Sequence, residues 1–80
     1  MKQQNITPNI TLDLRGIACP LNFVKTKIQL EKMHSGQKLE VFLDSGEAIE
    51  SVPPSVIEEG HKILKIEPIG NYFKVWILRN

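Results

Sequence analysis

Cys19, the single cysteine of the 80-residue chain, is the residue whose type and position most directly suggest chemistry. It precedes Pro20, and proline is common at the first position of a helix, because the amide hydrogen that proline lacks would have no partner there. The unpaired amides and partial positive charge of a helix N-terminus favour the thiolate, the nucleophilic form of cysteine. We therefore predict that Cys19 is the N-cap of a helix and carries a reactive thiol.

Neighbouring residues are expected to support this thiolate. As the N-cap, Cys19 would accept hydrogen bonds from the backbone amides of Leu21 and Asn22. Arg15, in the turn before the helix, would add positive charge. The alternative is that Cys19 is a small apolar side chain buried where strand meets helix. We favour the functional role, because Ser, Thr, Asp or Asn would cap a helix better than cysteine does.

Other kinds of site have little support. A single cysteine excludes an internal disulfide and a Cys-x-x-Cys redox pair. His34 would lie at the far end of the helix that begins at Cys19, which excludes a dyad between the two, and His61 is interpreted as a surface residue. One cysteine and two distant histidines give no metal-ligand spacing, so we expect no metal site.

The composition argues against several classes of function. Ten basic and nine acidic residues leave a formal net charge of +1, which gives no general attraction to nucleic acid or to a membrane. The sequence has no apolar run of about 18 residues and no visible secretory signal. We therefore expect a cytoplasmic protein that binds neither nucleic acid nor membrane.

Apolar periodicity divides the chain into elements. Residues 1–8 are expected to be a flexible N-terminal segment, and residues 9–80 a single domain. Alternating apolar residues predict four strands, at 9–14, 38–43, 62–67 and 72–79. Helical spacing predicts two helices, at 19–34 and at 47–59, with Pro53-Pro54 kinking or dividing the second.

The order of these elements, βαβαββ, predicts an α+β fold. The first two strands are linked through a helix, so they should be parallel with a right-handed crossover. The last two should form a hairpin joined by residues 68–71. We expect a four-stranded mixed sheet with two helices on one face.

Two apolar patterns leave alternatives open. On the first helix, Phe23, Thr26, Leu30 and Met33 should face the core, whereas Leu21, Val24 and Ile28 form a second apolar stripe. On the last strand, Trp76 lies on the face away from the helices. There it would either contribute to an exposed aromatic patch that docks a partner or be half-buried by neighbouring strands.

The segment from Asp13 to Pro20, Asp-Leu-Arg-Gly-Ile-Ala-Cys-Pro, resembles the motif of the TusA-like (SirA-like) sulfur carriers. The resemblance extends over residues 11–80, with Gly36 and Gly60 before the second and third strands. It implies a two-layer α/β sandwich. The family pattern is Cys-Pro-x-Pro, and this chain departs from it by having Asn22 in place of the second proline.

The resemblance also implies a function. A cysteine desulfurase or other donor would transfer sulfur to Cys19 as a covalent persulfide, with no other cofactor, and the chain would relay it to an acceptor protein. Asp13, Arg15, Gly16 and Pro20 match the motif around the acceptor cysteine. Such a chain is formally a sulfurtransferase that depends on partner enzymes, and we expect a monomer.

The apolar stripe formed by Leu21, Val24 and Ile28 would then be part of the docking surface for the donor. Packing of the stripe against the second helix is the alternative. A different function is also open, namely a non-catalytic protein-binding or redox-regulatory module that uses the open face of the sheet.

Overall fold

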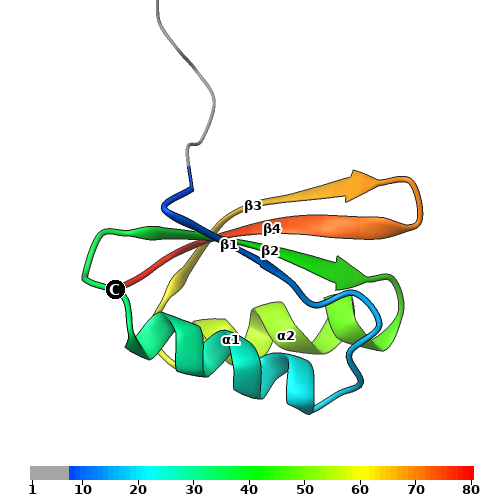
Figure 1. Cartoon of the computed structure of the whole chain (residues 1–80), viewed down its shortest axis with the longest axis horizontal. Helices are drawn as coiled ribbons and strands as arrows, with labels where there is room; N and C mark the ends of the chain where they lie inside the picture. The colour runs from blue at the N-terminus through cyan, green and yellow to red at the C-terminus, as the bar shows by residue number, and fades with distance from the viewer. Residues whose placement is uncertain (1–7) are drawn as a thin grey trace, which may run out of the picture.

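The computed structural model describes residues 8–80, so the expected N-terminal segment, apart from Pro8, lies outside the described residues. The chain forms a sheet with two helices packed side by side on one of its faces (Figure 1). The elements in chain order are β1 (Ile10–Asp13), α1 (Leu21–Glu31), β2 (Lys38–Asp44), α2 (Glu47–Glu58), β3 (Lys62–Ile69) and β4 (Tyr72–Leu78). The predicted α+β class and element order are confirmed.

The strand order is β1-β2-β4-β3. The β1 strand pairs in parallel with β2, with Asp13 opposite Phe42, and the other two pairings are antiparallel. Parallel strands end at the same edge of a sheet. The connection from β1 to α1 and the turn from β2 to α2 therefore lie side by side, although about 30 residues separate them in sequence.

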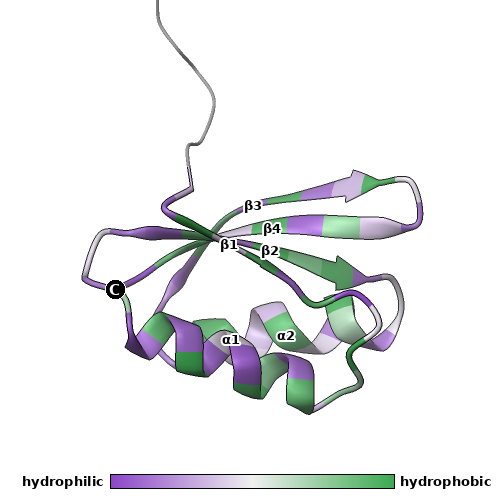
Figure 2. Cartoon of the chain, viewed as in Figure 1, coloured by the Kyte–Doolittle hydropathy of each residue, from purple (hydrophilic) through white to green (hydrophobic). Residues whose placement is uncertain are grey.

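The core lies between the sheet and the helices. On β2 the residues alternate strictly, and Leu39, Val41 and Leu43 are fully buried, as their spacing predicts. Apolar and polar residues also mix along β3 and β4, but without this strict alternation (Figure 2). On β4, three consecutive residues, Val75, Trp76 and Ile77, are buried. The other core positions are supplied mainly by Leu14, Leu30, Met33, Val52, Val56, Val75 and Ile77. The predicted core face of α1 is confirmed, with Phe23 only partly buried at its edge.

Both helices differ from prediction in their bounds or continuity. The first ends at Glu31 rather than His34, because its last turn tightens, with the Lys32 amide bonded to the Gln29 carbonyl, and the Gln37 side chain accepts the His34 amide. The second runs through Pro53-Pro54 as a single helix, so the expected division into two parts is wrong, whereas the alternative of a kink stays a prediction. Its apolar face packs on the sheet, and that burial outweighs the helical hydrogen bonds that the prolines cannot donate.

The hairpin between β3 and β4 is also tighter than predicted. Its turn is Gly70-Asn71, since Ile69 pairs with Tyr72 and Pro68 with Phe73. Pro68 is tolerated inside β3 because β3 is an edge strand, where an amide on the outer side needs no partner strand.

The open face of the sheet carries no exposed tryptophan. Trp76 retains only 7% of its surface exposed, and the amines of Lys65 and Lys74 lie 5.4 Å and 6.0 Å from the centre of its ring. Of the two alternatives for Trp76, the exposed aromatic patch is therefore wrong, and burial of the ring by its neighbours is confirmed.

Candidate functional site

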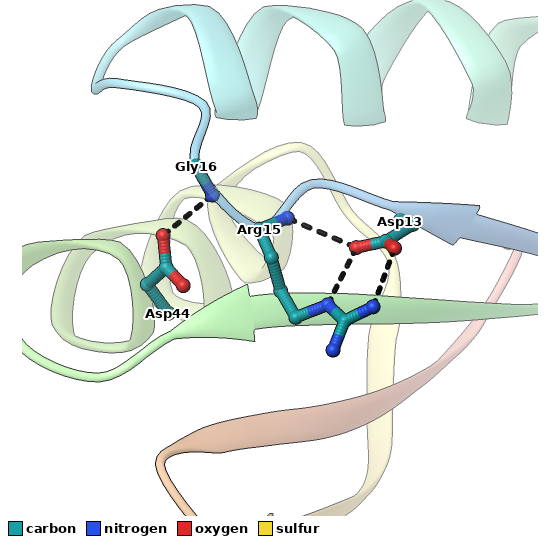
Figure 3. Close-up of polar contacts among 4 residues, drawn as sticks. All are labelled: Asp13, Arg15, Gly16 and Asp44. Atoms are coloured by element: carbon teal, nitrogen blue, oxygen red, sulfur yellow. Dashed lines mark hydrogen bonds and ion pairs between the residues drawn. The ribbon is translucent and has the colours of Figure 1, made fainter.

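The connection from β1 to α1 begins with a tightly bonded turn. The Arg15 guanidinium donates two hydrogen bonds to the Asp13 carboxylate, at 3.0 Å and 2.8 Å, and the Arg15 backbone amide donates a third at 3.1 Å (Figure 3). The side-chain hydrogen bonds lower the pKa of Asp13 to about 2 and raise that of Arg15. A planar guanidinium held by both carboxylate oxygens has a defined orientation, so this pair fixes the turn.

The Arg15 side chain points away from α1 (Figure 3). Its guanidinium carbon lies 4.6 Å from the centre of the Tyr72 ring and 5.6 Å from that of Phe42, both on the open face of the sheet. The Arg15 guanidinium thus contacts Asp13 and these two rings. The expectation that Arg15 adds positive charge near Cys19 stays a prediction.

The next residue, Gly16, ties the connection to the end of β2. Its amide donates a 2.7 Å hydrogen bond to the Asp44 carboxylate (Figure 3). Gly16 has a φ of 82°, a backbone conformation that glycine adopts freely and residues with a Cβ adopt at a cost. The Asp-x-Arg-Gly part of the motif is therefore a structural clasp between the ends of the two parallel strands.

The Cys-Pro part of the motif begins α1 differently from prediction. Pro20 is the N-cap and the helix starts at Leu21, so Cys19 lies one residue before the cap. The Asn22 amide donates to the Ala18 carbonyl at 3.1 Å, closing a turn that contains Cys19. This amide is therefore committed to the backbone, and the prediction that it serves the thiolate as a hydrogen-bond donor is wrong.

Cys19 is a free, exposed thiol, so its interpretation as a buried apolar side chain is also wrong. Its sulfur lies 3.6 Å from the Ser51 hydroxyl oxygen, within reach of a weak hydrogen bond. Ser51 lies in the second turn of α2. Sequence reasoning missed Ser51, because only the packing of α2 beside α1 brings it to the cysteine.

An open pocket of about 180 Å³ adjoins Cys19. From the connection into α1, it is lined by Ile17, Ala18, Cys19 and Asn22. From the turn into α2, it is lined by Asp44, Ser45, Glu47 and Ala48. We call this space the Cys19 pocket. It lies where two helices begin, and the first turn of α2 has no side-chain cap on its backbone amides.

The apolar stripe faces solvent. Leu21, Val24 and Ile28 are 50%, 42% and 48% exposed. Packing against α2 therefore does not account for the stripe, because core residues on the same helix, such as Leu30, are almost completely buried. The stripe begins at Leu21, two residues from Cys19.

The histidines lie apart from this site. The His61 ring nitrogen Nδ1 accepts the backbone amide of Asn80, and burial, with the nearby charge of Arg79, lowers the pKa of His61. His34 is exposed beyond the end of α1. Residues 8–80 contain no cluster of three or more His, Cys, Asp or Glu side chains that could hold a metal ion.

The sequence of this chain matches that of a known protein family. The sequence pattern of the family described as sulfurtransferase TusA matches residues 10–79, nearly the whole chain. The chain belongs to the TusA family. The match includes both the Asp13–Arg15 clasp and Cys19, so the TusA-like resemblance predicted from the motif is confirmed.

Relatives in this family are named as candidate sulfur carrier proteins. One from Archaeoglobus fulgidus is 43% identical over 75 residues, covering 94% of this chain and 83% of the relative. One from Thermotoga maritima is 41% identical over 68 residues, covering 84% and 86%. Another, named TsuB, from Escherichia coli, is 35% identical over 60 residues, covering 75% and 80%.

A solved structure supports the fold. A SirA-like protein from Desulfitobacterium hafniense matches with a TM-score of 0.75, covering 86% of this chain and 95% of that protein. At 21% identity, this likeness bears on the fold alone. Among the described residues of this TusA-family chain, no helix is long and apolar enough to cross a membrane.

Proposed function

We propose that this chain carries sulfur as a persulfide on Cys19, received from a cysteine desulfurase or a similar donor and relayed to an acceptor protein. The observation that carries the proposal is the exposed thiol of Cys19, held on a clasped connection beside an open pocket. A donor's active site can reach an exposed thiol directly, which a sulfur relay between two proteins requires. We place the relay in the cytoplasm, where thiols stay reduced.

The transfer step exchanges one sulfur–sulfur bond for another. The Cys19 thiolate attacks the terminal sulfur of the donor's persulfide, a new bond forms between that sulfur and Sγ of Cys19, and the donor's cysteine leaves as a thiolate. Electrons balance without an external oxidant, because each broken S–S bond is replaced. In the second step an acceptor thiolate takes the terminal sulfur and Cys19 leaves as the thiolate.

The apolar stripe supplies a docking surface for the donor. A partner that covers Leu21 would lie directly over Cys19, two residues away, and would bury exposed apolar surface beside the reacting sulfur. Lys25 is also exposed on α1 and adds positive charge to this helix, which would attract an acidic rim on the partner.

The alternative function, a binding module that uses the open face of the sheet, has less support. Lysine side chains cover Trp76 on that face, and Arg15 covers Tyr72 and Phe42. The open face therefore lacks the exposed aromatic surface that suggested this function.

Intact-mass spectrometry tests the proposal. The protein is mixed with a cysteine desulfurase and cysteine in the absence of reductant, and we expect a mass gain of one sulfur atom that disappears on reduction. Reduction is essential, because oxidation of the thiol to a sulfinic acid adds two oxygens of nearly equal mass and is not reversed by ordinary reductants.

Cys19→Ser is the control and should gain no sulfur. If the wild-type thiol is alkylated readily but several desulfurases leave its mass unchanged, the carrier function is wrong. The binding module would then be the better account.

A further inference from the structure

The side chain of Asn22 has an unusual environment beside Cys19. Asn22 is completely buried, and its amide nitrogen Nδ2 has no hydrogen-bond partner among residues 8–80. Its oxygen Oδ1 accepts the backbone amide of Phe23 at 2.7 Å. That contact fixes the orientation of the side chain, because exchanging the nitrogen and oxygen would place two donors against each other.

A buried donor without a partner is unfavourable and calls for an explanation at the site where it occurs. Asn22 lines the Cys19 pocket. Its own backbone amide is used by the Ala18 carbonyl, so Nδ2 is the unused hydrogen-bond donor of Asn22.

We propose that the Cys19 pocket holds the terminal sulfur of the Cys19 persulfide, and that Asn22 is a positioning residue whose Nδ2 group donates a hydrogen bond to this sulfur. The inference rests on the proposed carrier function. A persulfide extends one sulfur atom beyond Sγ, and Cys19 and Asn22 line the same pocket. The loaded state thereby gives the unpaired donor an anionic partner.

The surroundings of the pocket suit a small anion of limited charge. The first turn of α2 directs uncapped backbone amides toward this end of the helix. The carboxylates of Asp44 and Glu47 are on residues that also line the pocket, and Asp44 already accepts the Gly16 amide. These carboxylates would repel a highly charged ligand such as a phosphate. They would repel a singly charged sulfur less, and the covalent bond to Cys19 keeps that sulfur in place.

The first test compares Asn22→Leu with the wild type after Cys19 is loaded by inorganic polysulfide, which needs no desulfurase. Leucine has a similar size and lacks the donor. We measure the alkylation rate of the loaded protein against pH by intact mass. A lost hydrogen bond to an anion should move the midpoint of this profile upward by about one pH unit, roughly a tenfold change.

Thr26→Val is the matched control. Thr26 is also fully buried on α1, one turn beyond Asn22, and donates to the Asn22 backbone carbonyl at 2.9 Å, but it does not line the pocket. It should lose comparable stability without moving the midpoint. An unmoved midpoint in Asn22→Leu, or an equal movement in both variants, would overturn the inference.

A second measurement uses the wild type and so does not depend on the folding of a variant. The side-chain amide resonances of Asn22, observed by nuclear magnetic resonance, should shift and exchange with solvent more slowly when Cys19 is loaded. Unchanged Asn22 resonances, with Cys19 itself shifted, would also contradict the inference. Failure of a desulfurase to load Cys19 would instead count against the proposed relay, since polysulfide loading tests Asn22 separately.

Discussion

The segment from Asp13 to Asn22 includes the connection between β1 and α1 and the start of α1, and its two halves differ in how completely their polar groups are bonded. In the first half, Asp13, Arg15 and Gly16 form four hydrogen bonds among themselves and with Asp44. In the second half, the Cys19 thiol has only a weak contact with Ser51, and the Asn22 side-chain nitrogen has no partner in the described part of the chain. A region whose polar groups are hydrogen-bonded is thus followed by a region in which some of them are not.

This difference distinguishes residues that hold the shape of the segment from residues that are available for chemistry. Groups that are already bonded hold a shape, and groups with unused bonding capacity are available to a ligand or a partner. Changes in the first half should therefore act on stability and, through the shape of the connection, on sulfur uptake. A change at the exposed Cys19 should act on uptake with little effect on stability, whereas a change at the buried Asn22 should affect both.

The largest effect is expected from a charge in the exposed stripe. In Leu21→Glu, docking of the donor would bury a carboxylate against apolar surface, so desulfurase-dependent loading should slow by about tenfold, equivalent to roughly 1.4 kcal/mol. Stability should hold, because Leu21 is exposed and an acidic residue is favourable in the first turn of a helix. Loading rates at several donor concentrations measure the effect on docking, and thermal unfolding measures the effect on stability.

Ile57→Glu is the matched control for this charge. Ile57 is 56% exposed on α2, outside the apolar stripe. It should leave the loading rate unchanged. Equal slowing in the two variants would show that the stripe is not a specific docking surface, and unfolding of Leu21→Glu would return the stripe to a packing role.

A smaller effect is expected from Gly16→Ala. The φ of 82° would strain alanine, and an added Cβ would meet no atom within 4 Å, so the cost is confined to the backbone, about 1 kcal/mol in the free energy of unfolding. Gly36→Ala is matched to it, with a φ of 89° and the same free space. Chemical denaturation should give similar losses for both.

Only Gly16→Ala should also slow the loading of Cys19, because only Gly16 belongs to the clasp that leads to the cysteine. Loading that is equally fast in the two variants would show that the clasp contributes stability alone.

The smallest effect concerns the Asp13–Arg15 pair at low pH. The pKa of Asp13 is about 2 in the folded chain against an ordinary value of 3.8, so the folded state holds the carboxylate against protonation. Its contribution to stability is present above pH 3.8 and is lost as the pH falls toward 2. Asp13→Asn should therefore lose less stability than the wild type across this range.

Urea unfolding at several pH values gives the free energy of unfolding of the wild type and of Asp13→Asn, and the dependence of each on pH can then be compared. Because the pair is exposed, the difference should be small. If the free energy of unfolding falls equally with pH in both proteins, the stability of the clasp does not depend on the charge of Asp13.

The elements could be predicted from the sequence where a single physical pattern dominates. Alternation along Leu39, Val41 and Leu43 predicted β2 because one face of that strand is buried and the other is not. At Pro53-Pro54 the prediction of a divided helix is wrong, because local propensity predicts a break, whereas packing of α2 on the sheet keeps the chain helical.

The site could be predicted only in part. Cys19 stood out because of its residue type, and its exposure agrees with a functional thiol. Its position relative to the helix could not be read from Cys-Pro, because the turn closed by Asn22 and Ala18 places the cap at Pro20. The pocket and Ser51 depend on α2 lying beside α1, and such long-range contacts leave no local signal in the sequence.

Following the sulfur atom itself tests whether Cys19 carries sulfur between a donor and an acceptor. The protein is incubated with a cysteine desulfurase and cysteine that carries a heavy sulfur isotope, and the peptide containing Cys19 is then examined by mass spectrometry. We predict one labelled sulfur atom on Cys19, removed by reductant and passed to an added acceptor thiol. An unlabelled Cys19 peptide, with the thiol shown to be accessible, would contradict it.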